Sequence, residues 1–485
     1  MKKFYAFFIL SFYSISFNAQ HWVDMMEQPG SNFYSIQSAF NNYFTTHDPT
    51  EKGKGWKQFK RWENFMEPRV YPSGDLTLPS QNMKNFETFL QNNSTQKLSN
   101  PNMIASSTWT AVGPFGPLAG SAGGQLLKAG RLNFITIHPA GSNTLFVGAP
   151  AGGLWKSTDA GVTWTTNTDF LTVTGCSDLA IDPTNTNIMY LATGDGDAGD
   201  TYSNGVLKST DGGNTWAATG LAWTVNQGRV IRRLLINPTN TQIIMAATNV
   251  GIWRTTNGGT TWTQVFTTST HDLEFMPGNP NTVYAGGASF RKSTDGGATW
   301  VVINSGIPTT GVDRMAVAVT PANPNYVYVL AGNSTNNGFQ GFYRSTNSAT
   351  SFSTMATSPN LLGWSSTGSD TGGQSWYDLC CAASPLNQDE VVVGGVNVWR
   401  TTNGGSNWTI YGHWTGTGAP FTHADHHDLE YDAAGTLFNC NDGTVYRRTA
   451  TNWQEISGLM NISQIYKIGT SALTANFWLT GHQDN

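Results

Sequence analysis

Residues 209–216 read S-T-D-G-G-N-T-W, and segments of the same pattern recur along the chain. Six copies and a degenerate seventh start about 38 to 56 residues apart, the length of one four-stranded propeller blade. The repeat therefore predicts an all-β fold, a β-propeller of about seven or more four-stranded blades. The copies cover 157–164, 209–216, 255–262, 293–300, 345–352 and 401–408, and the degenerate one covers 447–453.

The conserved positions of each copy suit a tight hairpin turn. An Asp or Asn oxygen can accept hydrogen bonds from backbone N–H groups of its own turn, and the Gly that follows tolerates a positive φ. An amide oxygen caps a turn as well as a carboxylate does, but it cannot act as a nucleophile. We therefore interpret these side chains as structural: Asp159, Asp211, Asn257, Asp295, Asn347 and Asn403.

Composition favours the same fold class. Charged residues make up only 12% of the 485 residues, whereas there are 53 Gly and 18 Trp, which suits short strands and tight turns. The net charge is −5, and Lys and Arg are scattered along the chain. A basic surface for a polyphosphate is missing, so we expect no nucleic-acid partner.

The first 19 residues are typical of a signal peptide. Lys2 and Lys3 precede an apolar run from Phe4 to Phe17, and the small residue Ala19 suits a cleavage site. That run of ~14 residues is shorter than the ~20 that a spanning helix needs, which argues against a membrane anchor. We expect a secreted protein, extracellular or on the cell surface, with no membrane span after cleavage.

Residues 20–105 contain no repeat and predict a short helical extension. Phe33, Ile36, Phe40 and Phe44 are spaced by three and four, as on one face of a helix, and residues 83–90 suggest another helix. A cleaved pro-segment is the alternative, although no dibasic site supports it.

Residues 106–485 are assigned to the propeller, and both ends of this region suggest how it closes. The segment around Trp109 matches the last strand of a blade without a repeat before it, so we expect it to complete the final blade. After the degenerate copy, residues 462–468 and 476–480 begin another unit that stops at Asn485. We expect the chain to be truncated within that unit and to belong to a longer protein.

These repeats resemble those of Asp-box (BNR) propellers, and within that group the Vps10 domain of sortilins and the xyloglucanase-type glycoside hydrolases. The resemblance covers roughly residues 108–485. Residues 61–63 and 66–69 and the run 423–427 also look like secreted Bacteroidetes proteins, many of which use type IX secretion. The repeated segment, the Asp box, indicates the fold but not the function, because sialidases, receptors and lectins share it.

The resemblance to xyloglucanases implies two catalytic Asp residues. The first belongs to a T-D-x-G-G-x-Y-R-W run, but the matching segment 149–156 has Pro150 at the Asp position. The second belongs to a G-x-G-D-x-G-G run, which Gly481 to Asp484 matches. Asp484 is therefore the candidate catalytic residue, and it lacks its partner. Sialidase motifs are not found.

Three further groups of residues are candidates for binding. Asp195, Asp197 and Asp200 could surround Ca²⁺, or form a solvated turn. The run 423–428 could hold a metal, face a ligand or serve structural hydrogen bonds. Tryptophans outside the boxes could stack on sugars or fill the core. The candidate ligand-binding residues are Trp223, Trp364, Trp376, Trp414, His423, Asp425, His426 and His482.

The four cysteines are Cys176, Cys380, Cys381 and Cys440, each in or beside an apolar segment. Export would permit one disulfide, and buried free thiols are the alternative. Apart from Ca²⁺ we expect no cofactor.

These observations lead to one functional hypothesis with two alternatives. The first is a secreted propeller that binds an extracellular ligand, a polysaccharide before a protein, on the face opposite the boxes. A glycoside hydrolase with rearranged acids would combine Asp484 with Asp195, Asp197 or Asp425. A sortilin-like protein-binding scaffold is the third hypothesis.

Overall fold

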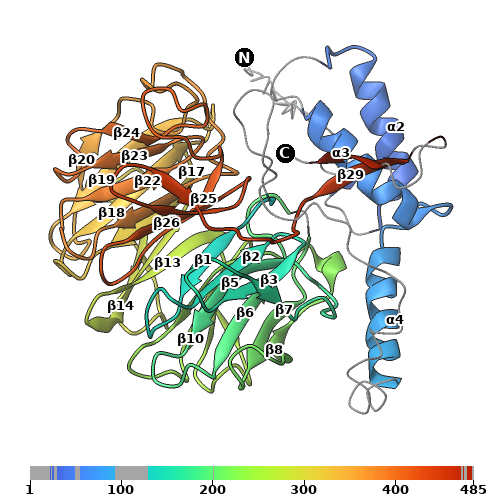
Figure 1. Ribbon diagram of the computed structural model, residues 1–485, viewed down its shortest axis with the longest axis horizontal. Coiled ribbons are helices and arrows are strands. Elements are labelled where there is room, and N and C mark those ends of the chain that lie inside the picture. Colours follow the sequence, from blue (N-terminus) through green and yellow to red (C-terminus); the bar gives the residue numbers. More distant parts are fainter. Residues whose placement is uncertain are drawn as a thin grey trace, which may run out of the picture. The chain divides into compact units, whose positions relative to one another are not determined.

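The computed structural model describes residues 22, 25–26, 30–49, 55–92, 129–199, 201–470, 473 and 478–482. The chain divides into two compact units, residues 1–94 and 95–485 (Figure 1). The predicted signal peptide, Trp109, Asp200 and Asp484 lie outside the described residues. Within the described part, none of the helices has the length and apolar character required to cross a membrane.

The first unit is helical, as its sequence predicted. It contains α2 (Phe33–Phe44), α3 (Trp56–Val70) and α4 (Leu78–Asn92). Asn32 caps α2 by accepting a hydrogen bond from the Tyr34 N–H. Buried Phe40 stacks on Phe59 with ring centroids 3.7 Å apart, which joins the first two of these helices through an aromatic core.

The second unit contains seven four-stranded antiparallel blades, and each blade uses four consecutive strands. The first strands contact one another from blade to blade. The first three blades are β1 (Phe134–Ile137), β2 (Leu145–Ala149), β3 (Gly153–Ser157), β4 (Thr165–Thr166); β5 (Cys176–Ile181), β6 (Met189–Thr193), β7 (Gly205–Ser209), β8 (Ala217–Ala222); β9 (Ile231–Ile236), β10 (Ile244–Thr248), β11 (Gly251–Thr255) and β12 (Thr263–Phe266).

The remaining four blades repeat this order. They are β13 (Thr270–Met276), β14 (Asn279–Gly287), β15 (Arg291–Ser293), β16 (Val301–Val302); β17 (Val312–Val319), β18 (Val327–Asn333), β19 (Phe339–Ser345), β20 (Ser353–Ala356); β21 (Cys380–Ala383), β22 (Val391–Gly394), β23 (Val398–Thr401), β24 (Thr409–Gly412); β25 (His426–Tyr431), β26 (Leu437–Asn441), β27 (Val445–Arg448) and β28 (Trp453–Glu455).

Three aspartates on the inner strands connect neighbouring blades. Each follows a β-bulge and accepts a hydrogen bond from a backbone N–H of the next inner strand. The pairs are Asp178 with Leu234 at 2.6 Å, Asp272 with Val317 at 2.7 Å, and Asp428 with Ile135 at 3.0 Å. The last pair joins β25 to β1 across 293 residues, so blades 7 and 1 close the ring (Figure 1).

This closure differs from the one expected from the sequence. Because β25–β28 supply all four strands of blade 7, an added N-terminal strand is not needed to complete it. Residues beyond blade 7 form a separate two-stranded sheet of β29 (Ile465–Thr470) and β30 (Trp478–His482). The described ring is complete before this hairpin begins.

The repeated turns connect the third and fourth strands of their blades. In all six, the Asp or Asn oxygen accepts a hydrogen bond from the N–H four residues later, at 2.8 to 3.0 Å. A buried Ser or Thr hydroxyl donates to the same side chain, as Ser157 does to Asp159 at 2.8 Å. Two residues with positive φ follow, for example Gly212 and Gly213. These contacts explain the repeat as a turn.

All four cysteines are free thiols. Burial raises the pKa of each of these thiols above its ordinary value. They serve as packing residues of β5, β21 and β26.

Candidate functional site

Because neighbouring strands of a blade are antiparallel, successive connections between strands alternate between two faces of the propeller. The repeated turns and the connections from first to second strand share one face, which we call the box face. Connections from second to third strand, and from each fourth strand to the next blade, share the opposite face, which we call the loop face. Every inner strand therefore begins at the loop face.

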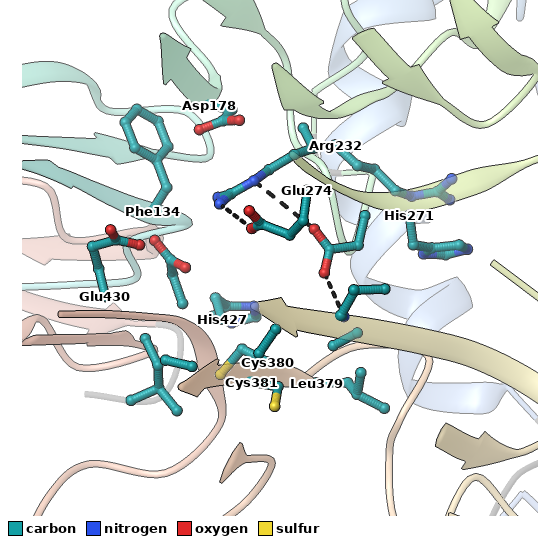
Figure 2. A pocket seen from close by; sticks show the side chains of 18 of the residues that line it. Phe134, Asp178, Arg232, His271, Glu274, Leu379, Cys380, Cys381, His427 and Glu430 are labelled. Atoms are coloured by element: carbon teal, nitrogen blue, oxygen red, sulfur yellow. Dashed lines mark hydrogen bonds and ion pairs between the residues drawn. The ribbon is translucent and has the colours of Figure 1, made fainter. Parts of the chain in front are cut away.

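A cavity of about 380 Å³ follows the inner strands (Figure 2). Arg233 lies within it and donates to Glu274 at 3.0 Å. Burial raises the pKa of Glu274 to about 7, that of Asp428 to about 6 and that of Glu430 to about 8. Several carboxyl groups thus share one guanidinium, and at neutral pH part of them carry a proton.

An ion-pair network closes the loop-face end of this channel. Arg131 pairs with Asp195 through two hydrogen bonds of 2.8 and 3.2 Å. Asp197, from blade 2, reaches Arg314 of blade 5 at 2.7 Å and His427 of blade 7 at 3.0 Å. Contacts that join opposite blades make this network a plug across the channel.

His427 lies between two carboxylates of the plug. Its Nδ1 lies 3.0 Å from Asp197 and its Nε2 lies 2.8 Å from Asp442, which also accepts from the Tyr377 hydroxyl at 2.7 Å. Burial and Arg131 lower the pKa of His427, but its hydrogen bonds to the two aspartates outweigh them and raise it above the usual value. This shift favours the protonated imidazole, which the two carboxylates hold in place.

Asp195 and Asp197, two of the three residues predicted to bind Ca²⁺, lie in this plug. The carboxylates of Asp195 and Asp197 face arginines, and Asp200 is outside the described residues. Among the described residues, no group of three His, Cys, Asp or Glu side chains is placed to hold a metal ion. Calcium binding stays a prediction without support from these contacts.

The side chains of the run 423–428 diverge. His426 is buried, with Nδ1 2.8 Å from the Asn439 side chain, and burial lowers its pKa to about 3. His423 is half-buried and contacts the carbonyl of Ala424. Asp425 has a φ of 63° and accepts from the Gln374 side chain at 2.6 Å. Asp425 thus contacts the loop that carries Trp364 and Trp376.

Three of the four candidate tryptophans are exposed on loops of the loop face. The exposed fractions are 44% for Trp364, 43% for Trp376 and 36% for Trp414. Asn397 donates to the carbonyl of Trp364 at 3.0 Å and accepts from the N–H of Trp414 at 3.3 Å, so these two lie in neighbouring segments. Trp223 is instead half-buried against Trp253.

Among position 150, Asp378 and Asp425, the loop face does not present a pair of exposed carboxyl groups suited to hydrolysis. Pro150 lies in the turn after β2, and its carbonyl accepts from the Thr201 hydroxyl at 2.6 Å. Gln374 donates to both Asp378 and Asp425. Burial, followed by the charge of Asp425, raises the pKa of Asp378 well above its usual value. Asp378 is completely buried, so this acid is shielded from a polymer.

His482 is the described neighbour of the candidate acid Asp484. It lies half-buried at the end of β30, where its ring nitrogen contacts the Thr480 hydroxyl. This hairpin is separate from the blades, so the described residues do not bring His482 together with the tryptophans.

Sequence reasoning missed the charged residues of the channel mouth. Arg131, Arg232, His271 and Arg314 are far apart in the chain and belong to no motif. The signal that could have found them is a polar side chain near the start of successive inner strands, where an apolar residue is expected.

Fold and site together define a seven-bladed β-propeller with a plugged channel and an aromatic loop face. No protein-family profile matches the chain. It is 28% identical over 216 residues to a xyloglucanase of Acetivibrio thermocellus, covering 35% of this chain and 25% of that protein. A Hypocrea jecorina xyloglucanase is 29% identical over 191 residues, with shares of 36% and 22%. The matches thus span about a quarter of the length of these relatives.

Solved structures show the same fold. The GH74 xyloglucanase of Xanthomonas campestris aligns with a TM-score of 0.56 and 16% identity, covering 73% of this chain and 58% of that one. The GH74 enzyme of Niastella koreensis aligns with a TM-score of 0.53 and 21% identity, covering 73% and 56%. At such identities the similarity establishes the propeller fold alone.

Proposed function

We propose that this protein is a secreted propeller that binds an extracellular polysaccharide on its loop face without hydrolysing it. The observation that carries the proposal is the exposure of Trp364, Trp376 and Trp414 on loops of one face. Flat aromatic rings bury the apolar C–H surface of sugars, and exposed apolar side chains gathered on one face often mark a ligand-binding surface. The xyloglucanase names of the relatives support a glycan as the ligand.

Binding is tested with tryptophan variants of the full chain in calorimetry against soluble polysaccharides. Trp364→Ala and Trp376→Ala should each weaken binding at least about tenfold, since a lost aromatic contact is worth on the order of 1.5 kcal/mol. Leu386→Ala is the control, because Leu386 is 67% exposed on the connection from β21 to β22, which belongs to the box face. Equal losses for all three variants would contradict a tryptophan site.

The alternative function is glycoside hydrolysis with rearranged acids. The raised pKa of Asp378 beside Asp425 favours it, because a general acid must hold its proton near neutral pH. We expect no turnover of xyloglucan, since position 150 supplies no carboxyl group and Asp378 is buried. Release of reducing sugar that disappears in Asp378→Asn and Asp425→Asn would establish the enzyme instead.

A further inference from the structure

A group of polar side chains lies at the mouth of the channel, beside the plug. Arg232 and His271 are the second residues of β9 and β13, and Arg314 is the third residue of β17. Their strands are the inner strands of three successive blades, and all three residues line the same cavity. Figure 2 shows Arg232 and His271 next to each other at one side of the cavity.

Arg232 differs from the other arginines of the channel in its partners. Its hydrogen bonds go to the carbonyl of Gly196 at 3.1 Å, the hydroxyl of Ser269 at 3.1 Å and the carbonyl of Thr270 at 3.5 Å, all neutral groups. Arg131, Arg233 and Arg314 each form an ion pair, whereas within the described residues Arg232 forms none.

The charge environment of Arg232 suits an anion. Burial and then the charge of Arg314 lower the pKa of Arg232 to about 10, although Asp197, Asp195 and Asp313 act in the opposite direction. Asp197 is already held by Arg314 and His427, and the Asp313 carboxylate accepts from the Ser375 hydroxyl. The nearby carboxylates are therefore engaged elsewhere.

His271 and Arg291 supply the second, independent observation. His271 Nδ1 is buried without a hydrogen-bond partner among the described residues, and so are Nε and Nη1 of Arg291, which stacks on Phe266 at 4.5 Å. Burial, Arg232 and Arg314 hold the pKa of His271 well below 6.5, so the imidazole is neutral. An anionic ligand at this place would give the two Arg291 nitrogens, which can only donate, an acceptor, and it could also pair with the His271 imidazole.

We infer that Arg232 and His271 form an anion subsite, so that the polysaccharide bound by this propeller carries acidic groups, uronate carboxylates or sulfates. This inference rests on the proposed function and names the class of glycan. Arg232 would donate charge-assisted hydrogen bonds to an acidic oxygen, and His271 would add a neutral donor. Arg314 also contacts the carbonyl of Tyr377 at 3.4 Å, which places the exposed ring of Trp376 close to the same mouth.

The test compares three polymers on the full chain by calorimetry: polygalacturonate, dextran sulfate and uncharged xyloglucan. We expect at least about tenfold tighter binding of one acidic polymer, and Arg232→Gln should remove that preference while binding of xyloglucan is unchanged. The matched control is Arg447→Gln, since Arg447 also has a neutral partner, Gln454, but lies on a third strand. The Arg447→Gln variant should prefer the acidic polymer over xyloglucan to the same extent as the unsubstituted chain.

Two further measurements keep the inference falsifiable if Arg232→Gln does not fold. His271→Ala should reduce the acidic preference about threefold, and added salt should weaken binding of the acidic polymer more than that of xyloglucan. Equal binding of charged and uncharged polymers overturns the anion subsite and leaves the proposed function intact. Failure to bind any of the three overturns both, and a preference for sulfate over galacturonate identifies sulfated glycans as the source.

Discussion

The box face and the loop face of this propeller are built by different rules. On the box face, the same short-range contacts recur in six turns, between residues two and four positions apart. On the loop face, the decisive contacts join residues 64, 117 and 230 positions apart and occur once each. The comparison teaches that the repeat specifies the scaffold, while unrepeated residues from distant blades specify the site.

The largest expected effect belongs to the loop face. Arg131→Met removes the guanidinium that pairs with the buried carboxylate of Asp195 and lies near that of Asp442, so the free energy of unfolding should fall by about 3–5 kcal/mol. Urea unfolding measures the change, and Arg447→Met should stay within about 0.5 kcal/mol. If Arg131→Met also changes stability by less than about 1 kcal/mol, the plug does not hold the blades together.

A smaller effect is expected in the channel between the two faces. The folded pKa of Glu430 is about 8, above the ordinary 4.5, so its contribution to stability is complete below about pH 4.5 and is lost as the pH rises through 8. Glu430→Gln should therefore lose less stability between pH 5 and pH 8 than the unsubstituted chain, by about 1 kcal/mol or more. Parallel pH profiles of the two proteins would show that Glu430 is charged in the folded state.

The smallest effect is expected on the box face. Asn257 accepts from the N–H of Thr261 at 2.9 Å and makes local contacts only. Asn257→Asp should leave the melting temperature nearly unchanged, since a carboxylate accepts the same bonds, whereas Asn257→Ala should cost about 1 kcal/mol. A large loss in Asn257→Asp would mean that the amide nitrogen, which donates to the Thr261 hydroxyl, is the essential group.

Much of the fold was predictable because its signals are local. Blade 3 shows this: the repeat copy at 255–262 connects β11 to β12, and β9 and β10 precede it, as the four-stranded repeat predicted. The helix from Phe33 to Phe44 followed from the spacing of its aromatic residues. The exposed Trp364, Trp376 and Trp414 were candidates because they lie outside the boxes, but sequence could not separate them from Trp223, which packs inward.

The sequence by itself determined the blade. Its turns are held by hydrogen bonds to their own Asp or Asn side chains, and its strands follow from alternating residues, so both depend only on residues close together in the chain. Only the tertiary structure decided that seven blades close through Asp428 and Ile135, and that Asp197 is a partner of Arg314 and His427. It also decided that Arg232 is left among neutral partners. The physical reason is that charge pairing depends on distance in space, and the closed ring brings together strands that the chain keeps far apart.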